Sequence, residues 1–239
     1  MGIVRMGVPE NLVTKLKEQF NVKTFVETGT YYGGTAVWAS RVFNNVITIE
    51  YSKSLYEQTK TKCKNIDNIE FLFGDSRTVL KELSLRMESL AVVWLDAHWS
   101  GDITYGEDDQ CPLIEEINII NDSGFDHFIL IDDARLFTSP PQHPQKFDQW
   151  PSISEVVDAL RAKFNDKYVV IIEDVIIAVP KFAKPLLADY CQEVNARAWE
   201  DYGRYNNKSA MQKGLDLVVS DLISRIKAFA KRIKNKILK

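Results

Sequence analysis

The stretch "KYVVIIEDVIIAVP", residues 167–180, decides the fold. Two apolar runs rich in valine and isoleucine flank only Glu173 and Asp174. Such runs are typical of β-strands. So short a connection can join only antiparallel neighbours, because parallel strands need a crossover of about a dozen residues or more. The stretch therefore predicts an antiparallel β-hairpin near residue 173.

Upstream of this hairpin, five β-rich runs alternate with stretches of helical periodicity. The five runs are residues 23–27, 45–50, 69–75, 91–96 and 127–133. Strands separated by roughly 10 to 15 helical residues are typical of βαβ units, which form a parallel sheet with helices on both faces. We therefore expect an α/β fold with a seven-stranded sheet, in which five parallel strands are followed by the antiparallel hairpin.

Composition sets the class of protein. The chain has 239 residues, of which 45% are hydrophobic and 26% charged, which is ordinary for a globular protein with one sizeable core. A net charge of -3 gives no indication of a nucleic-acid partner. The three cysteines are widely spaced, so neither a disulfide framework nor a structural zinc site is expected. Without a signal-peptide pattern or an 18-residue apolar run, we expect a cytoplasmic protein.

The last part of the chain differs in character from the rest. We expect a Rossmann-like domain at residues 1–180 and a helical extension at residues 181–239. Residues 185–202 read as one helix, and the tail from about residue 213 reads as another. In the tail, apolar residues at steps of three and four alternate with basic ones, which predicts a basic amphipathic helix. Such a helix could form an oligomer contact, bind an anionic membrane surface, or pack on the core of the same chain.

Each of the five parallel strands is expected to end in an acidic residue. In an open parallel sheet, ligands bind outside the carboxyl ends of the strands. The acids at these ends are Glu27, Glu50, Asp75, Asp96 and the pair Asp132 and Asp133. A single acid at a strand end is common, but five in succession predict one acidic site.

The first three strand ends favour a cofactor that contains adenosine. Glycines after Glu27 allow a tight turn and a close approach of ligand, although neither a dinucleotide GxGxxG motif nor a Walker lysine is present. Glu50 could accept hydrogen bonds from both ribose hydroxyls, and Asp75 with Ser76 could reach an adenine amino group. An acidic lining suits the cationic sulfonium of S-adenosylmethionine better than a phosphate-rich cofactor. The expected cofactor-binding residues are Glu27, Gly29, Tyr31, Gly33, Thr35, Glu50, Asp75 and Ser76.

The motifs "FVETGTYYGGT", "ITIE", "FGDS" and "WLDAHW" resemble those of the class I S-adenosylmethionine-dependent methyltransferases. The resemblance covers residues 24–180. Within this class, the chain more narrowly resembles the macrocin-type O-methyltransferases, which methylate sugars. It implies a Rossmann-like methyltransferase fold and transfer of a methyl group to a hydroxyl of a sugar, glycan or other small-molecule acceptor. It also implies a Mg²⁺ ion held by Asp96, Asp132 and Asp133, beside a general base.

The chemistry of methyl transfer agrees with these implied roles. A sugar hydroxyl is a poor nucleophile until it loses its proton, and a hard cation held by carboxylates can lower the pKa of that hydroxyl. His98, two residues after Asp96, is the candidate base, with Asp96 beside it in the catalytic site. The alternatives stay open: the acids could form a solvated rim, and His98 could be a packed loop residue.

Two long loops, residues 100–116 and 134–152, follow the fourth and fifth strands and are expected to lie over the site. Their aromatic and imidazole side chains could contact the acceptor or only pack the loops together; they are Trp99 at the edge of the first loop, Tyr105, His143, Phe147 and Trp150. Arg135 could serve substrate charge or pair with an acid.

Two rival functions stay open. One is a metal-independent methyltransferase that acts on another small molecule. The other is a non-catalytic cofactor-binding module that the tail docks in a larger assembly. A dinucleotide oxidoreductase is disfavoured, because the phosphate-binding glycine pattern is absent.

Overall fold

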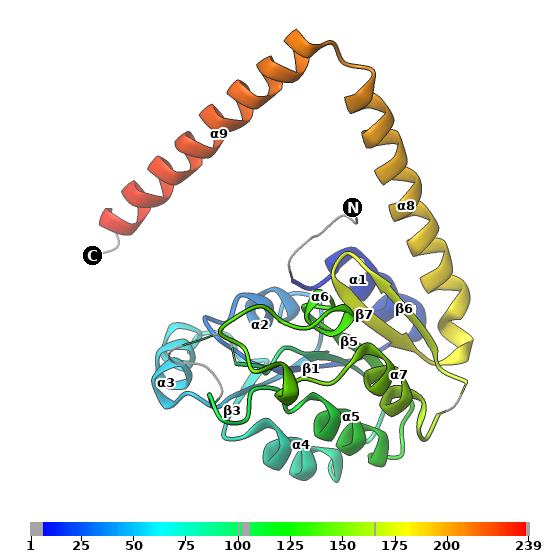
Figure 1. Cartoon of the computed structure of the whole chain (residues 1–239). Coiled ribbons are helices and arrows are strands. Elements are labelled where there is room, and N and C mark those ends of the chain that lie inside the picture. Colours follow the sequence, from blue (N-terminus) through cyan, green and yellow to red (C-terminus); the bar gives the residue numbers. More distant parts are fainter. Residues whose placement is uncertain (1–6, 100, 102–105, 165, 238–239) are drawn as a thin grey trace. The chain divides into compact units, whose positions relative to one another are not determined.

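A computed structural model describes residues 7–99, 101, 106–164 and 166–237 (Figure 1). The sheet has seven strands in the order β3-β2-β1-β4-β5-β7-β6. The first five strands pair in parallel, whereas β7 runs antiparallel to both β5 and β6. The predicted parallel sheet with a final antiparallel hairpin is therefore confirmed. The strands are β1 (Thr24–Thr28), β2 (Asn45–Glu50), β3 (Ile69–Phe73), β4 (Ala91–Leu95), β5 (Phe128–Ile131), β6 (Tyr168–Ile172) and β7 (Val175–Val179).

The register of the sheet brings the carboxyl ends of the central strands to one level. Thr28, the last residue of β1, pairs with Ile49 of β2 on one side and with Leu95 of β4 on the other. Leu95 pairs in turn with Ile131, the last residue of β5. The residues that follow these strands therefore meet at one edge of the sheet, where a ligand site is expected.

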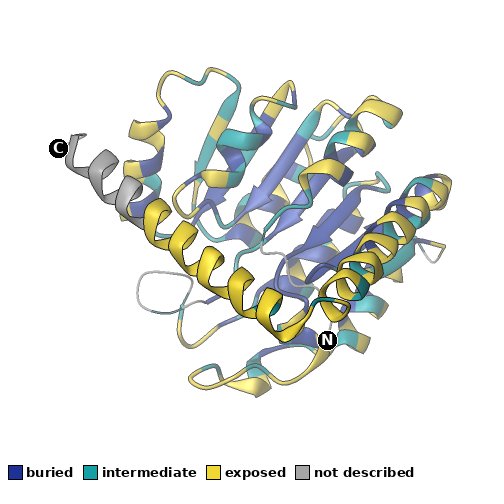
Figure 2. Cartoon of the chain, turned by 90° about the horizontal axis from the view of Figure 1, so that it is seen from above, coloured by how far each residue is buried: buried dark blue, intermediate teal, exposed yellow. Residues whose placement is uncertain are grey.

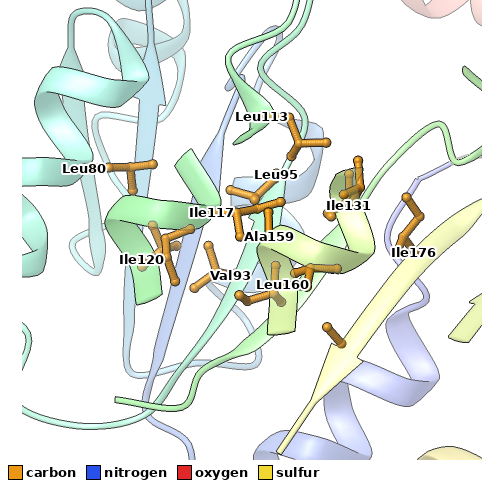
Figure 3. Close-up of a cluster of buried hydrophobic side chains, with 14 of the residues drawn as sticks. Leu80, Val93, Leu95, Leu113, Ile117, Ile120, Ile131, Ala159, Leu160 and Ile176 are labelled. Carbon is orange, nitrogen blue, oxygen red and sulfur yellow. The ribbon is translucent and has the colours of Figure 1, made fainter. Parts of the chain in front are cut away.

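One face of the sheet is covered by α4 (Ser76–Ser84), α5 (Leu113–Asp122) and α7 (Ile153–Arg161). Their apolar side chains form the main hydrophobic core with the strands, and Figure 3 shows Ile117 and Leu160 of two helices beside Val93 of β4. The helix α7 begins with a capping box between Ser152 and Glu155, which satisfies backbone donors at its start.

The other face is covered by α1 (Glu10–Phe20) and α2 (Gly34–Ala39). Phe20 of α1 stacks on Phe128 of β5 at a ring distance of 5.5 Å, and Phe25 of β1 meets Trp38 of α2 at 6.1 Å. The remaining helical segments before residue 184 are α3 (Lys53–Lys62), α6 (Arg135–Thr138), η1 (Phe147–Gln149) and η2 (Lys181–Ala183).

Strands inside the sheet are more deeply buried than the two strands at its edges. All residues of β4 and of β7 are buried, whereas the edge strands β3 and β6 are mostly half-buried or exposed. Figure 2 shows the central strands in dark blue. The apolar run of residues 92–95 is thus buried on both faces, as a strand in the centre of a parallel sheet requires.

The chain divides into two compact units, Met1–Tyr190 and Cys191–Lys239. The helix α8 (Lys184–Asn206) spans this division, and α9 (Ala210–Ile237) belongs to the second unit. Among the described residues, no helix is long and apolar enough to cross a membrane. The expected boundary near residue 180 between a Rossmann-like domain and a helical extension stays a prediction.

Candidate active site

The turn after β1 is tight and is fixed by a contact with β4. Gly29 has a φ of 85°, and a Cβ atom at this position would lie 2.4 Å from the carbonyl oxygen of Asp96. No other residue type fits there, because the side chain would collide with backbone that cannot move away. Gly33 also has a positive φ, of 73°, where it precedes α2. The predicted first loop therefore touches the exit of the fourth strand directly.

Glu27 is buried near the end of β1, just before this turn. Its Oε2 accepts a hydrogen bond of 2.6 Å from the Thr48 hydroxyl, and Thr48 is 2.6 Å from the hydroxyl of Thr30. Burial raises the pKa of Glu27 to about 8, and the hydrogen bonds from Thr48 and Thr35 offset only part of that rise. At neutral pH this carboxyl group is therefore largely protonated.

Glu50 connects the end of β2 to the first loop. Its Oε2 accepts the backbone N–H of Tyr31, and its Oε1 accepts that of Ser52, both at 2.8 Å. Burial raises the pKa of Glu50, although these backbone donors oppose the rise. The carboxylate is thus held at the carboxyl edge of the sheet, at the position predicted for a ribose ligand.

Asp75 has a structural duty at the start of α4. Its Oδ1 accepts the Arg77 backbone N–H at 2.9 Å, which caps the helix, and its Oδ2 pairs with the Arg77 guanidinium at 2.7 Å. Arg77 also reaches Asp109 at 2.8 Å. The predicted contact of Asp75 with an adenine amino group stays a prediction, but its carboxylate already has two partners in the chain.

Next to Asp75, the hydroxyl of Ser76 faces the carboxyl group of Glu116, which α5 contributes, and Thr28 interacts with the same carboxyl group. One oxygen of that group, Oε1, is buried without a hydrogen-bond partner in the described part of the chain. Burial raises the pKa of Glu116 to about 7. Glu116 is not among the residues predicted from the sequence, although the pattern of its helix indicates it. It lies on the same helical face as Leu113, Ile117 and Ile120, which are all buried.

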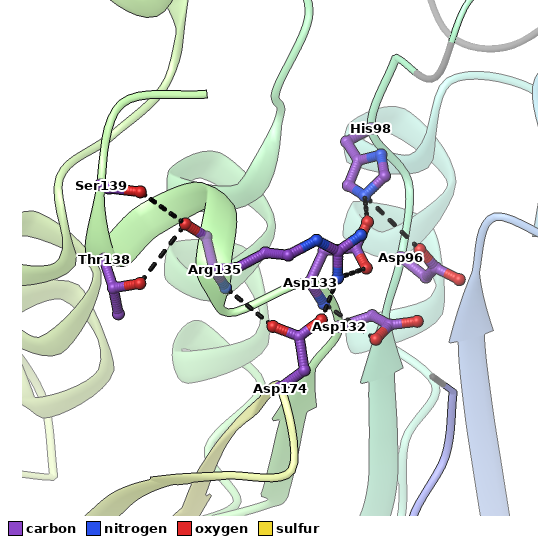
Figure 4. Close-up of polar contacts among 8 residues, drawn as sticks. All are labelled: Asp96, His98, Asp132, Asp133, Arg135, Thr138, Ser139 and Asp174. Carbon is purple, nitrogen blue, oxygen red and sulfur yellow. Dashed lines mark hydrogen bonds and ion pairs between the residues drawn. The ribbon is translucent and has the colours of Figure 1, made fainter. Parts of the chain in front are cut away.

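The ends of β4 and β5 bring an imidazole and three carboxyl groups together (Figure 4). His98 Nε2 lies 3.0 Å from Asp133 Oδ2 and 3.8 Å from Asp96 Oδ1. The Asp133 backbone N–H donates to Asp132 Oδ1 at 2.8 Å. The structure thus brings these four predicted residues together, Asp96 and His98 after β4 and Asp132 and Asp133 after β5, and their roles stay a prediction.

Burial and pairing set the protonation of this cluster. Burial raises the pKa of Asp96 to about 7 and that of Asp132 to about 6. Burial alone would also raise the pKa of Asp133, but the hydrogen bond from His98 and the Arg135 guanidinium outweigh it and lower that pKa. For His98, burial acts to lower the pKa, and the contacts with Asp133 and Asp96 outweigh it, so the pKa is raised.

Arg135 pairs with acids. Its NH1 lies 2.8 Å from Asp133 Oδ1 and also contacts Asp174, and its backbone N–H donates to Asp174 Oδ1 at 2.9 Å. Asp174 lies in the β6–β7 turn with a φ of 66°, so the hairpin that decides the fold also reaches the site. Asp174 is not among the residues predicted from the sequence, because the sequence pattern does not tell which side chains the turn faces.

A pocket of about 340 Å³ opens beside His98. Trp99 and Arg135 line it, as do residues 139–142 and Gln145, whose buried Oε1 has no hydrogen-bond partner in the described structure. Trp150 is buried and its ring lies 5.4 Å from that of His98 at a tilt of 49°, whereas Phe147 is exposed. His143 is exposed in the second loop, and Tyr105 lies outside the described residues.

The cluster is not arranged as a metal site. Within the part of the chain that the structure describes, no group of three His, Cys, Asp or Glu side chains could hold a metal ion. The reason is visible at Asp133, whose two oxygens already face His98 and Arg135. The predicted set of Asp96, Asp132 and Asp133 as Mg²⁺ ligands therefore stays a prediction that would need Asp133 to change partners.

Neither a family model nor a curated protein sequence matches the chain. Similar solved structures include a protein from Staphylococcus aureus provisionally named a caffeoyl-CoA O-methyltransferase, with a TM-score of 0.54 and 13% identity over 74% of this chain and 86% of that one. A provisionally named O-methyltransferase from Klebsiella pneumoniae has a TM-score of 0.51 and 12% identity over 72% and 79%. A Podospora anserina methyltransferase with SAH bound has a TM-score of 0.50 and 18% identity over 72% and 77%. At such identities the likeness concerns the fold.

Proposed function

We propose that the protein is an S-adenosylmethionine-dependent methyltransferase that acts on a hydroxyl of a small-molecule or glycan acceptor. The observation that carries the proposal is the His98–Asp133 contact of 3.0 Å at the wall of a pocket, next to the strand end of Asp96. Asp96 in turn touches the first loop at Gly29. A group able to take a proton thus lies beside the loop expected to hold the cofactor.

The side chains near the first loop would suit S-adenosylmethionine. Glu50 would hold the ribose, the Gly29 turn would lie against the ligand, and Glu116 Oε1, which is buried without a hydrogen-bond partner among the described residues, would accept an amino group. When bound, this cofactor supplies an electrophilic methyl group on a cationic sulfonium. The roles of Tyr31, Gly33, Thr35 and Asp75 in binding stay part of the proposal.

His98 and Asp96 would activate the acceptor. Asp133 lies 3.0 Å from Nε2 of His98, and this contact would hold the imidazole in place beside the pocket. Asp133 then stabilises the imidazolium that forms when the hydroxyl proton is taken. Asp96, whose pKa is about 7, is the second group with a pKa suited to accept this proton near neutral pH.

The pocket favours an acceptor rich in hydroxyl groups. Its wall combines hydrogen-bonding side chains of Ser139, Gln142 and Gln145 with the flat ring of Trp99. The buried Gln145 Oε1 lacks a donor within the described residues, and a sugar hydroxyl would supply one. These features support a sugar or glycan acceptor of the kind that the macrocin-type enzymes use. A cytoplasmic location is part of the proposal, and three free cysteines support it.

The part played by Mg²⁺ is a separate point. Asp96, Asp132 and Asp133 would be its ligands, and a bound cation would lower the pKa of the acceptor hydroxyl. The pairing of Asp133 with Arg135 and His98 favours the metal-independent reaction instead. A chelator separates the two: full activity in EDTA supports proton removal by protein side chains alone, and activity restored only by added Mg²⁺ supports the metal.

The proposal is tested first by calorimetric titration of S-adenosylhomocysteine into the wild type and Glu50→Ala. We expect micromolar binding to the wild type and a loss of about tenfold or more in the variant, since hydrogen bonds to a charged group contribute about 1.5–3 kcal/mol each. Incubation with S-adenosylmethionine and a panel of glycosides then identifies the acceptor by formation of S-adenosylhomocysteine. Binding of cofactor without turnover on any acceptor would favour a non-catalytic cofactor-binding module. No binding to a folded wild type would overturn the proposal.

A further inference from the structure

The helix α9 carries a continuous apolar stripe that is exposed in the structure. Leu215, Val219, Leu222 and Ile226 follow one another at steps of three and four residues, which places them on one side of a helix. Between 48% and 64% of each of these side chains is exposed. Figure 2 shows the described part of α9 in yellow along its length. An apolar stripe of this length indicates a surface that binds a partner.

The charge of the same helix is strongly asymmetric. From Leu222 to the last residue the sequence has seven lysines and arginines and no aspartate or glutamate. The acids of α9 are Asp216 and Asp221, which precede this segment. Asp216 pairs with Lys208 at 2.6 Å and Asp221 with Arg225 at 2.8 Å. Apart from Arg225, which pairs with Asp221, the basic residues of this segment have no acidic residue within the segment to neutralise them.

Exposed aromatic residues lie in the same unit of the chain. Trp199 and Tyr202 of α8 have 72% and 60% of their surface exposed, and their rings meet edge to face at 5.9 Å. Tryptophan and tyrosine have an apolar ring with a polar tip, so they are enriched where a bilayer meets water. This second observation points to the same kind of partner as the basic amphipathic helix.

We propose that α9 binds the surface of an anionic lipid bilayer. The helix would lie in the plane of the interface, with the apolar stripe among the acyl chains and the lysines and arginines against the lipid phosphates. A bilayer with anionic lipids offers continuous negative charge to all seven basic residues. A second copy of α9 would offer Asp216 and Asp221, which are already paired, so charge favours the lipid surface over self-association.

The test is cosedimentation of the full-length protein with vesicles. One set contains equal parts of phosphatidylcholine and phosphatidylglycerol, and the other contains phosphatidylcholine alone. We expect sedimentation with the anionic vesicles that weakens as salt is raised, because salt screens charges at the surface. Sedimentation with neither set, or equally with both sets, would overturn the proposal.

Two leucines of α9 provide a matched pair for the apolar stripe. Leu222→Gln changes the stripe, whereas Leu217→Gln changes a leucine that lies about 200° around the helix from the stripe and is 66% exposed. We expect a loss of vesicle binding of about tenfold in Leu222→Gln, since burial of a leucine side chain contributes about 1.5–3 kcal/mol, and little change in Leu217→Gln. Equal loss in both variants would contradict a specific apolar face.

The basic residues are tested with two variants of equal charge. One replaces four cations of the tail by glutamine, and the control replaces four exposed lysines of the sheet unit; these are Lys231, Arg232, Lys234 and Lys236 in the tail, and Lys15, Lys23, Lys64 and Lys81 in the control. Each basic group near an anionic surface contributes about fivefold, so the tail variant should lose at least about tenfold in binding and the control little. Equal losses would assign binding to net charge and overturn the role of α9.

Light scattering tests whether the apolar stripe of α9 binds a second copy of the chain instead of a bilayer. A wild-type dimer that Leu222→Gln converts to a monomer, without vesicle binding by either protein, would assign the stripe to a second copy of the chain and overturn the proposal. A wild-type monomer that sediments with anionic vesicles would support it.

Discussion

The two ends of the sheet bury ionisable groups of opposite sign. At the carboxyl end, burial raises the pKa of Glu27 to about 8, of Asp96 and Glu116 to about 7 and of Asp132 to about 6. At the amino end, burial lowers the pKa of His127 to about 4, with a contribution from the Lys167 charge, and lowers that of Lys167. In both places, burial disfavours the charged form.

The two ends differ in how completely the buried groups are paired. His127 accepts the Ala91 backbone N–H at Nδ1 at 3.0 Å and meets the Ser123 hydroxyl at Nε2 at 2.8 Å. Lys167 contacts Asp126 and donates to the His127 carbonyl at 2.8 Å. At the carboxyl end, by contrast, Glu116 interacts with Ser76 and Thr28, but its buried Oε1 lacks a hydrogen-bond partner within the described residues.

This contrast separates a structural end from a functional one. A paired buried group ties strands together, whereas an unpaired one costs stability unless a ligand completes it. We therefore expect substitutions at the amino end to lower the stability of the fold and leave ligand binding unchanged. Substitution of the protonated Glu27 at the carboxyl end should leave stability unchanged or raise it, whereas Asp75, which caps α4, also contributes to stability.

The largest effect is expected for His98→Gln in the proposed reaction. Loss of a general base lowers the rate by about 10²–10⁴-fold. His127→Gln, the matched change at the amino end, should leave the rate unchanged when both enzymes are folded. The measurement is kcat with an acceptor found by the glycoside screen, together with the Kd of S-adenosylhomocysteine, which should be similar in both variants. An unchanged kcat in His98→Gln would transfer the role of base to Asp96.

The second-largest effect is expected for Glu27→Gln, which should become more stable than the wild type as the pH rises. The pKa of Glu27 is raised from 4.5 to about 8, so the stability associated with its proton is present at low pH and is lost as the pH rises towards 8. Between pH 5 and pH 8 the wild type should lose about 3 kcal/mol through this group. Glutamine does not titrate and can still accept the Thr48 hydrogen bond.

Urea unfolding of both proteins at pH 5 and pH 8 measures this effect. The difference in the free energy of unfolding between variant and wild type should move by about 3 kcal/mol in favour of Glu27→Gln as the pH rises. A constant difference would mean that Glu27 is ionised in the folded protein at both pH values. In that case the carboxyl end would not bury protonated acids at this position.

Features that depend on neighbouring residues in the sequence could be predicted, whereas contacts between distant segments could not. The strands, their parallel order and the acids at their ends follow from local periodicity and from the short connection at Glu173 and Asp174. The meeting of Asp96, His98 and Asp133 follows because parallel strands end at one edge. These features need no knowledge of side-chain orientation.

The missed features depend on contacts between distant segments. Arg135 and Asp174 are 39 residues apart, and only the three-dimensional course of the hairpin brings them together. The choice of Arg77 as the partner of Asp75 is likewise a matter of side-chain conformation, which periodicity does not encode. Glu116 is the exception, since an acid on the buried face of an amphipathic helix is visible in the sequence.

The third prediction compares two lysine–aspartate pairs, each 41 residues apart. Lys167 is fully buried and pairs with Asp126, whereas Lys163 is 46% exposed and lies 3.3 Å from Asp122, which is 80% exposed. Lys167→Met should lower the free energy of unfolding by about 2–3 kcal/mol, because Asp126 and a buried carbonyl lose their partner. Lys163→Met should change it by less than about 0.5 kcal/mol.

Urea unfolding at pH 7 measures both variants, and titration of S-adenosylhomocysteine provides the binding readout. Neither lysine should alter the Kd, because both lie at the amino end of the sheet. A weaker Kd in Lys167→Met than in Lys163→Met, for folded protein, would contradict the separation of the two ends.

The smallest effect is expected from acid titration of His127. Its pKa is lowered from 6.5 to about 4, so its contribution to stability is present above 6.5 and is lost as the pH falls towards 4. From pH 7 to pH 5 the wild type should lose about 2 kcal/mol through this group. The acids at the carboxyl end act in the opposite direction over the same range, so the total stability hides the effect.

The difference in the free energy of unfolding between His127→Gln and the wild type isolates the contribution of His127, because every other group titrates in both proteins. If that difference does not move towards the variant by about 2 kcal/mol on acidification, His127 is able to charge in the folded state, and the amino end is less well buried than its contacts with Ala91 and Ser123 imply.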